Sequence, residues 1–174
     1  MTDAAYDKDI DNGPDNGNDA ALKRSMYAAA VNMLALREHS EKELRDKLIR
    51  KFANRAALDE VISRLIAQGY LSDSRFAETA VRHYAGKGYG PGRIRMELRK
   101  RGVNPEEQEA VQNLSADDFI ARARDLAARK YGSIAEMDFK QKRRALAFLA
   151  RRGFSGEQCL RALSMSDEDF GADM

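Results

Sequence analysis

The chain has 174 residues, a net charge of +2 at neutral pH and 43% hydrophobic residues, enough apolar side chains to exclude a wholly disordered protein. Alanine occurs 27 times and leucine 15 times, whereas valine, isoleucine and threonine together occur 14 times, so we expect an all-α protein. The single cysteine excludes an internal disulfide framework and a multi-cysteine zinc site. No apolar run approaches the roughly 20 residues that span a bilayer, so we expect a soluble cytoplasmic protein.

Acidic residues are concentrated at the two ends of the chain. Residues 1–19 carry a net charge of −5 and residues 167–174 a net charge of −4, so the residues between them carry +11. The first segment is mostly Asp, Asn and Gly, unlike a signal peptide, and we predict a disordered acidic tail there and an acidic C-terminal end over 167–174. A basic body suits contact with a polyanion or an acidic protein, although solvated basic helix faces are also common.

Helix-start and helix-stop signals recur between the two ends. Four cap residues are followed three positions later by Glu or Gln, the pattern of a capping box: Ser40, Asn104, Asp138 and Ser155. Three glycines follow helical runs and indicate helix ends: Gly69, Gly102 and Gly153. These signals predict helices over residues 22–38, 41–52, 55–68, 74–86, 92–101, 105–113, 116–131, 139–152 and 156–163.

The signals repeat about every 50 residues. Segments beginning at Leu48, Leu98 and Leu149 each continue with a basic pair, a junction, a cap and another apolar helix, and these leucines lie 50 and 51 positions apart. The second and third segments have a glycine after the basic pair, where the first has Phe52. A fixed period indicates a repeat architecture. We predict three three-helix units, over residues 20–71, 72–114 and 115–166, which pack on one another because each buries little surface alone.

The segment GYGPGRIRMELRKRG, residues 88–102, combines glycines with five Lys or Arg residues. A phosphate-binding loop is disfavoured because Lys87 is not followed by Ser or Thr and the preceding residues have helical composition. We predict a flexible turn between two helices, with Pro91 starting the second. At helical spacing Ile94 and Leu98 form a buried stripe.

The positive charge of this helix exceeds what packing requires, and part of it recurs in the neighbouring units. Regular stacking of the units would align the repeated basic pairs into a stripe suited to a phosphate backbone or an acidic filament. The alternative is that duplication copied a helix-ending basic pair with no binding role. The candidate contact residues are Arg93, Arg95, Arg99, Lys100, Arg101, Arg50, Lys51, Arg82, Lys87, Arg151 and Arg152.

The sequence contains no recognisable catalytic set. We expect His39 to be exposed beside the Ser40 cap, His83 to lie at a junction between units, and Cys159 to pack on a helix face. Neither a nucleophile–base pair nor a carboxylate cluster at metal spacing emerges. We therefore predict a protein that is not an enzyme and binds no cofactor or metal.

Residues 69–103, GYLSDSRFAETAVRHYAGKGYGPGRIRMELRKRGV, resemble the RecX family of bacterial recombination regulators. Four features follow the family pattern in order: Gly-Tyr-Leu, Asp-x-Arg-Phe-Ala at 73–77, the glycine-rich turn, and Ile-x-x-Glu-Leu at 94–98. The upstream segment ALREHSEKELRDKL is similar to the family's first repeat. The resemblance covers about residues 25–163 and is looser in the last third.

The resemblance implies three tandem three-helix units in an elongated, curved molecule. It also implies a monomeric, non-enzymatic regulator of DNA repair, recombination and the SOS response. Such a protein binds the RecA recombinase filament on single-stranded DNA and inhibits its extension, ATP hydrolysis, strand exchange and co-protease activity. From the residues alone two alternatives remain: a general nucleic-acid-binding helical module that acts without the recombinase, and a purely structural scaffold.

Overall fold

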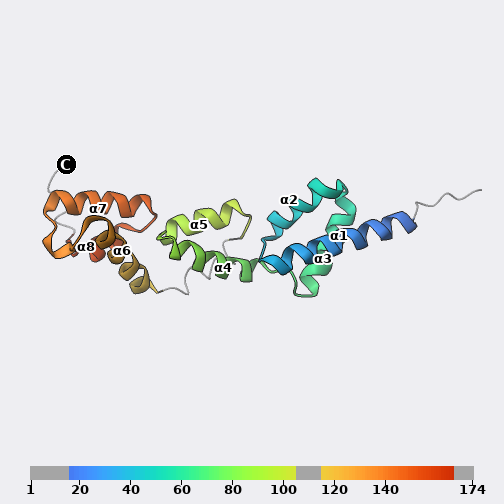
Figure 1. The fold of residues 1–174 in the computed structure, drawn as a ribbon, viewed down its shortest axis with the longest axis horizontal. Helices are drawn as coiled ribbons and strands as arrows, with labels where there is room; N and C mark the ends of the chain where they lie inside the picture. Colours follow the sequence, from blue (N-terminus) through green and yellow to red (C-terminus); the bar gives the residue numbers. More distant parts are fainter. Residues whose placement is uncertain (1–15, 105–114, 167–174) are drawn as a thin grey trace, which may run out of the picture.

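The computed structural model describes residues 16–104 and 115–166, and every regular element in these residues is helical. The helices form three groups along one long axis (Figure 1), which confirms the predicted all-α repeat fold. Within the described residues no helix combines the length and hydropathy that a membrane span requires. The elements are α1 (Asn16–Leu36), α2 (Glu41–Phe52), α3 (Arg55–Ala67), α4 (Asp73–Gly86), α5 (Pro91–Lys100), α6 (Ala116–Tyr131), the 3₁₀ helix η2 (Ile134–Glu136), α7 (Phe139–Arg151) and α8 (Gly156–Leu163).

The predicted helices agree closely with the observed ones, except at the start of α1. That helix begins at Asn16, six residues before the predicted start. Lys23 forms ion pairs with Asp19 at 2.7 Å and with Glu60 of α3 at 2.6 Å. Asp19 also lies in the first turn, where a carboxylate is favourable to the helix dipole. The predicted helix over 105–113 lies outside the described residues.

The local signals for helix ends are confirmed where the structure describes them. Ser40, Asp138 and Ser155 are N-caps whose side chains accept hydrogen bonds from the helices they start. Asp138 and Ser155 complete reciprocal capping boxes, whereas the Glu43 carboxylate turns away from Ser40 toward two arginines. The predicted glycines have the left-handed backbone of helix ends, with φ of +72°, +80° and +89° at Gly69, Gly102 and Gly153.

The buried side chains described by the structure form two hydrophobic cores. One core lies within α1, α2 and α3 and includes Leu48. The other runs through α4 to α8 and includes Ile94, Leu98 and Leu149, all fully buried. This confirms the predicted stripe on α5. The second and third units therefore share one core, while the first unit has its own.

The second and third units meet through the backbone of glycines. The Gly90 N–H donates to the Arg152 carbonyl at 2.8 Å, and the Gly92 N–H donates to the Gly153 carbonyl at 2.9 Å. A Cβ atom on Gly90 would lie 2.4 Å from the Gly153 carbonyl carbon, and one on Gly153 would lie 2.4 Å from the Arg93 nitrogen. The predicted turn between two helices and the start of the second helix at Pro91 are confirmed. The predicted flexibility did not anticipate the close-packed contact that this turn makes with the third unit at Gly90.

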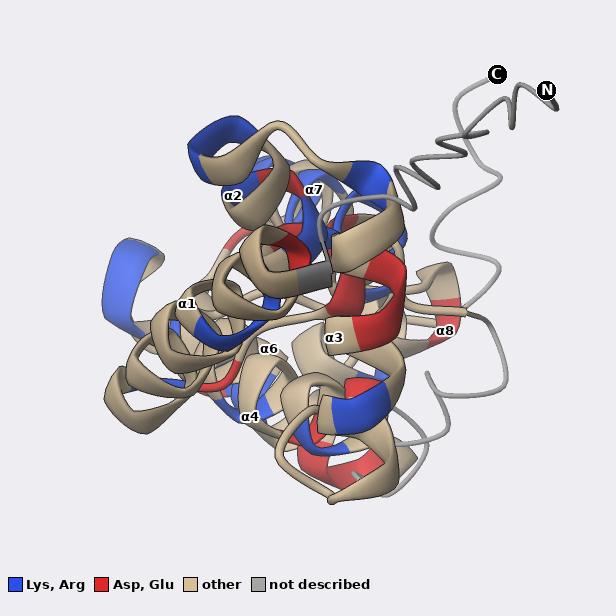
Figure 2. Cartoon of the chain, turned by 90° about the vertical axis from the view of Figure 1, so that its right-hand side faces the viewer, with Lys and Arg blue, Asp and Glu red and all other residues tan. Residues whose placement is uncertain are grey.

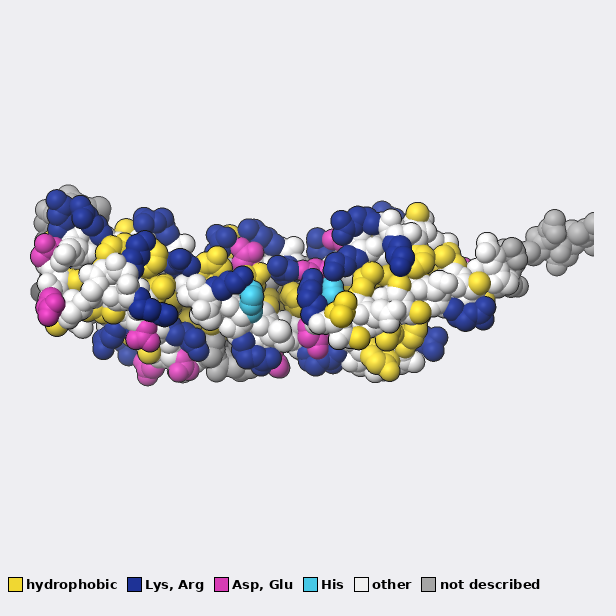
Figure 3. Space-filling model, in the orientation of Figure 1, with side chains coloured by type: hydrophobic (Ala, Val, Ile, Leu, Met, Phe, Trp, Pro, Cys, Tyr) yellow, Lys and Arg dark blue, Asp and Glu magenta, His cyan; other side chains and the backbone are white. Residues whose placement is uncertain are grey.

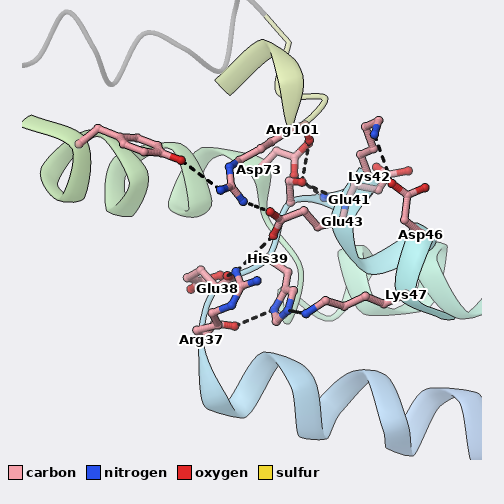
Figure 4. A network of polar contacts seen from close by, with 12 residues as sticks. Arg37, Glu38, His39, Glu41, Lys42, Glu43, Asp46, Lys47, Asp73 and Arg101 are labelled. Carbon is pink, nitrogen blue, oxygen red and sulfur yellow. Dashed lines mark hydrogen bonds and ion pairs between the residues drawn. The ribbon is translucent and has the colours of Figure 1, made fainter. Parts of the chain in front are cut away.

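The first and second units meet through polar groups (Figure 4). The Ser40 hydroxyl donates to the Arg101 carbonyl at 2.7 Å, and the Glu41 N–H donates to the Asp73 carboxylate at 2.7 Å. The Arg101 guanidinium forms an ion pair with Glu43. Since the two cores do not merge here, these contacts carry much of the connection between the first unit and the rest of the protein.

Both junctions join the second helices of successive units end to end. The C-cap of α5, Arg101, accepts from the N-cap of α2, Ser40, and the C-cap of α7, Arg152, accepts from the N-cap of α5, Gly90. Helix ends lack intrahelical partners and carry opposite partial charges, so this contact satisfies both ends. It places α2, α5 and α7 in a row along one side of the molecule (Figure 1), and a view along the long axis shows α2 and α7 on the same side (Figure 2).

His39, at the first junction, is buried with 2% of its surface exposed, so the prediction of an exposed ring was wrong. Its Nδ1 lies 3.0 Å from the Arg37 carbonyl oxygen and its Nε2 lies 2.8 Å from the Lys47 ammonium. A carbonyl oxygen only accepts, so Nδ1 carries the hydrogen and Nε2 accepts from Lys47. Burial lowers the pKa of His39 below its usual value; the hydrogen bond to the Arg37 carbonyl opposes this shift, and the charges on Arg37 and Lys47 add to it. Folding therefore favours the neutral form of the ring.

Gly153→Ala tests the close contact between the second and third units. Gly69 is the matched control, because it also follows a helix with positive φ but has open space around its Cβ position. Strain alone makes Gly69→Ala cost about 1 kcal/mol of unfolding free energy. Displacing the Arg93 backbone raises the cost of Gly153→Ala to about 3 kcal/mol. Equal losses for the two variants in urea unfolding would contradict this contact.

The buried His39 ring predicts that stability decreases in mild acid. Because its folded pKa lies below the unfolded value of about 6.5, the unfolded chain binds the proton more readily, and stability falls as pH drops below that value. His39→Gln should reduce the loss in urea midpoint between about pH 7.5 and about pH 5.5. His83→Gln, at an exposed histidine, should keep the full loss. A loss of unchanged size in His39→Gln would show that other groups cause it.

Candidate interaction surface

The predicted contact residues of α5 fall into two groups by exposure and pairing. Arg93 and Lys100 share one carboxylate, that of Glu97, at 3.0 and 3.5 Å. Arg95 and Arg99 are exposed, one helical turn apart, and have no acidic partner within the described parts of the chain. Arg95 and Arg99 are therefore the α5 cations that remain available to an outside partner.

The basic pair at the end of each second helix also divides into two series. The first series, Arg50, Lys100 and Arg151, is exposed in all three units. Figure 3 shows Lys and Arg side chains gathered along the edge that α2, α5 and α7 form, which we call the basic edge. Lys and Arg side chains lie along the opposite edge too, and Asp and Glu side chains stand among them on both edges. The first series lies at the C-terminal ends of α2, α5 and α7, the helices that form this edge, and its role in contacting a partner stays a prediction.

The second series, Lys51, Arg101 and Arg152, has a different role in the second and third units. Arg101 is half-buried and pairs with Glu43 of the first unit. The Arg152 guanidinium donates to the Lys87 carbonyl of the second unit at 3.2 Å and lies over a tyrosine ring. Each of these side chains reaches back to the preceding unit. Lys51, in the first unit, is exposed and lies over the neighbouring Phe52 ring.

The remaining candidates, Arg82 and Lys87, lie on or just after α4. Both side chains are exposed, and among the described residues Arg82 donates to Thr79, one turn earlier, at 3.3 Å. They belong to the second unit but to a different helix from the basic edge. The structure therefore brings Arg50, Arg95, Arg99, Lys100 and Arg151 onto the row of second helices, and leaves Arg82 and Lys87 beside it.

A basic face on the first half of α7 was not predicted from the sequence. Residues 139–144 read FKQKRR, a basic run with an aromatic residue at its start. Phe139 is 44% exposed, and Lys140, Arg143 and Arg144 are exposed around it. This basic run could have predicted a contact surface. It is not part of the repeated basic pairs, from which the contact residues were predicted.

The described residues contain little that suggests covalent chemistry. No group of three or more His, Cys, Asp and Glu residues in them is placed to hold a metal ion. Cys159 is fully buried, and burial raises the pKa of its thiol to about 11. A thiol that stays protonated is a poor nucleophile, so Cys159 serves the packing of α8, as predicted.

Comparison with protein families finds three consecutive matches. The first three-helix domain of RecX matches residues 27–65, the second matches residues 72–111, and the third matches residues 116–163. Each match falls on one of the three groups of helices, α1–α3, α4–α5 and α6–α8. The similarity therefore extends through the whole row and is not confined to one unit.

Individual relatives agree with the family matches. The regulatory protein RecX of Xanthomonas oryzae pv. oryzae (strain PXO99A) is 39% identical over 140 residues, which cover 80% of this chain and 86% of the relative. That of Halorhodospira halophila is 36% identical over 149 residues, covering 86% and 92%. The crystal structure of RecX from Lactobacillus salivarius superposes with a TM-score of 0.75 at 24% identity, covering 83% of this chain and 96% of that one, and so supports the fold.

Proposed function

This chain belongs to the RecX family of regulatory proteins, and from this premise we propose that it is a negative modulator of the RecA recombinase. It binds the RecA filament on single-stranded DNA as a monomer in the cytoplasm. Binding inhibits filament extension, ATP hydrolysis, strand exchange and co-protease activity. The observation that carries the proposal is that all three RecX domains match this chain in order.

The arrangement of the units supports binding along a filament. A filament offers the same surface again and again, and this protein presents an exposed cation at the same position in each of three units, Arg50, Lys100 and Arg151. Units joined in a fixed row engage successive sites as one multivalent ligand, which raises affinity without any new kind of contact. The elongated shape suits a position in the filament's helical groove.

Among the candidate cations, Arg95 and Arg99 give the clearest test of the contact surface. Arg101 and Arg152 hold the junctions between units, so replacing them would disturb the fold and the surface together. Arg93 and Lys100 are partly neutralised by Glu97. Arg95 and Arg99 project from α5 without acidic partners in the described residues, so their removal changes the surface charge and little else.

The double variant Arg95→Ala, Arg99→Ala should inhibit the recombinase more weakly. If each cation contributes about 1 kcal/mol to binding, half-inhibition of ATP hydrolysis on single-stranded DNA needs about thirtyfold more protein at physiological salt. The matched control is Arg122→Ala, Arg129→Ala, which removes the same charge from exposed positions on α6. That control should inhibit like the unmodified protein.

Two outcomes separate this proposal from its rivals. Unchanged inhibition by the Arg95, Arg99 variant would remove α5 from the contact. Failure of the unmodified protein to alter the recombinase's ATPase, together with tight and steeply salt-dependent binding to DNA alone, would instead support a general nucleic-acid-binding module.

A further inference from the structure

The outer face of α7 forms a shallow hollow of about 450 Å³ around an exposed aromatic ring. Its lining residues are Phe139, Lys140, Arg143, Arg144 and Ala147, which we call the α7 face. Phenylalanine is among the residues most often buried, yet 44% of the Phe139 surface is exposed. The ring stands at the first position of α7, so its side chain is held by a helix rather than by a loop.

Packing of the third unit does not require this face. The buried residues of α7 are Ala145, Phe148 and Leu149, which point into the core. The start of the helix is already secured by the reciprocal capping box between Asp138 and Gln141. Phe139 and its basic neighbours therefore add nothing evident to the core or to the cap.

The described residues of the α7 face carry charge of a single sign. As far as the structure describes it, the lining includes three cations and no carboxylate. Lys140 and Arg144, one turn apart, form no ion pair with any described residue, and the Arg143 guanidinium lies 5.9 Å from the centre of the Phe139 ring. Arg151 continues the same side of α7 toward its C-terminus, since positions 140, 144 and 151 have helical spacing.

We propose that the α7 face binds single-stranded nucleic acid, with one base stacked on Phe139 and neighbouring phosphates on Lys140, Arg143 and Arg144. Proteins commonly bind single-stranded nucleic acids with exposed aromatic rings beside cations, because every base has a π-face that can stack and every phosphate linkage has a negative charge. An acidic peptide would use the cations and leave the ring without a partner. This inference goes beyond the proposed function, because the site requires no recombinase.

The chain offers a direct reporter for stacking on this ring. It contains no tryptophan, so Phe139→Trp introduces the sole indole and retains an aromatic surface. Titration with an oligothymidylate should quench the tryptophan fluorescence as a base stacks on it. Leu36→Trp is the control, because Leu36 is 87% exposed at the end of α1, far from the α7 face. Its fluorescence should stay constant at oligonucleotide concentrations that saturate Phe139→Trp.

Affinity measurements separate stacking from charge. By fluorescence anisotropy with a labelled oligothymidylate, Phe139→Leu, which keeps an apolar side chain without a π-face, should bind about tenfold more weakly. Lys140→Ala, Arg143→Ala, Arg144→Ala should lower the slope of log affinity against log salt by about 2. The control Arg24→Ala, Arg55→Ala, Arg122→Ala removes the same charge from exposed positions elsewhere and should keep most of the slope.

Four results would overturn the proposal. Constant fluorescence of Phe139→Trp at saturating oligothymidylate would place the strand elsewhere. Equal affinities of Phe139→Leu and the unmodified protein, or equal salt slopes of the two triple variants, would leave the α7 face without a specific role. Equal quenching by polyglutamate would identify an acidic protein segment as the ligand instead. Thermal unfolding followed by circular dichroism checks that every variant is folded.

Discussion

The end-to-end contact between second helices is the constraint on which the rest of the structure depends. At each junction the C-terminal carbonyl of one helix meets the N-cap of the helix in the preceding unit, through Arg101 and Ser40 or through Arg152 and Gly90. The same geometry, used twice, aligns α2, α5 and α7 and makes the molecule elongated. The two junctions nevertheless differ in kind: the one at Gly90 lies over a shared core, whereas the one at Ser40 joins two separate cores through polar groups.

This constraint also explains why two adjacent basic residues that repeat together have different roles. The second residue of each pair is the helix C-cap in the last two units, so Arg101 and Arg152 lie against the preceding unit and hold it. The first residue lies one position earlier and faces solvent. Two of the basic residues that suggested a binding stripe, Arg101 and Arg152, therefore stabilise the row of units. The first residues of the pairs remain on the surface, and the row aligns them.

The sequence predicted the features that depend on residues a few positions apart, and it missed features that depend on contacts between separate helices. The caps at Asp138 and Ser155 depend on residues three positions away, and the buried pair Ile94 and Leu98 depends on helical spacing, so both were predictable. The close packing of the glycine-rich turn was not predicted because Gly90 is required by the backbone of Gly153, 63 positions later. His39 was misplaced because its ring contacts Lys47, eight positions later, at 2.8 Å, and the cap signal at Ser40 does not reveal this contact.

Amide hydrogen exchange at Gly90 and Gly92 tests the end-to-end contact most directly. These residues are the N-cap and second residue of α5, so their N–H groups have no acceptor within their own helix, and only the third unit supplies one. The structure predicts that both amides exchange about as slowly as the amide of Leu98 in the core of α5. Exchange of both at the rate of an unstructured chain, while Leu98 stays protected, would show that the units are not held in a row.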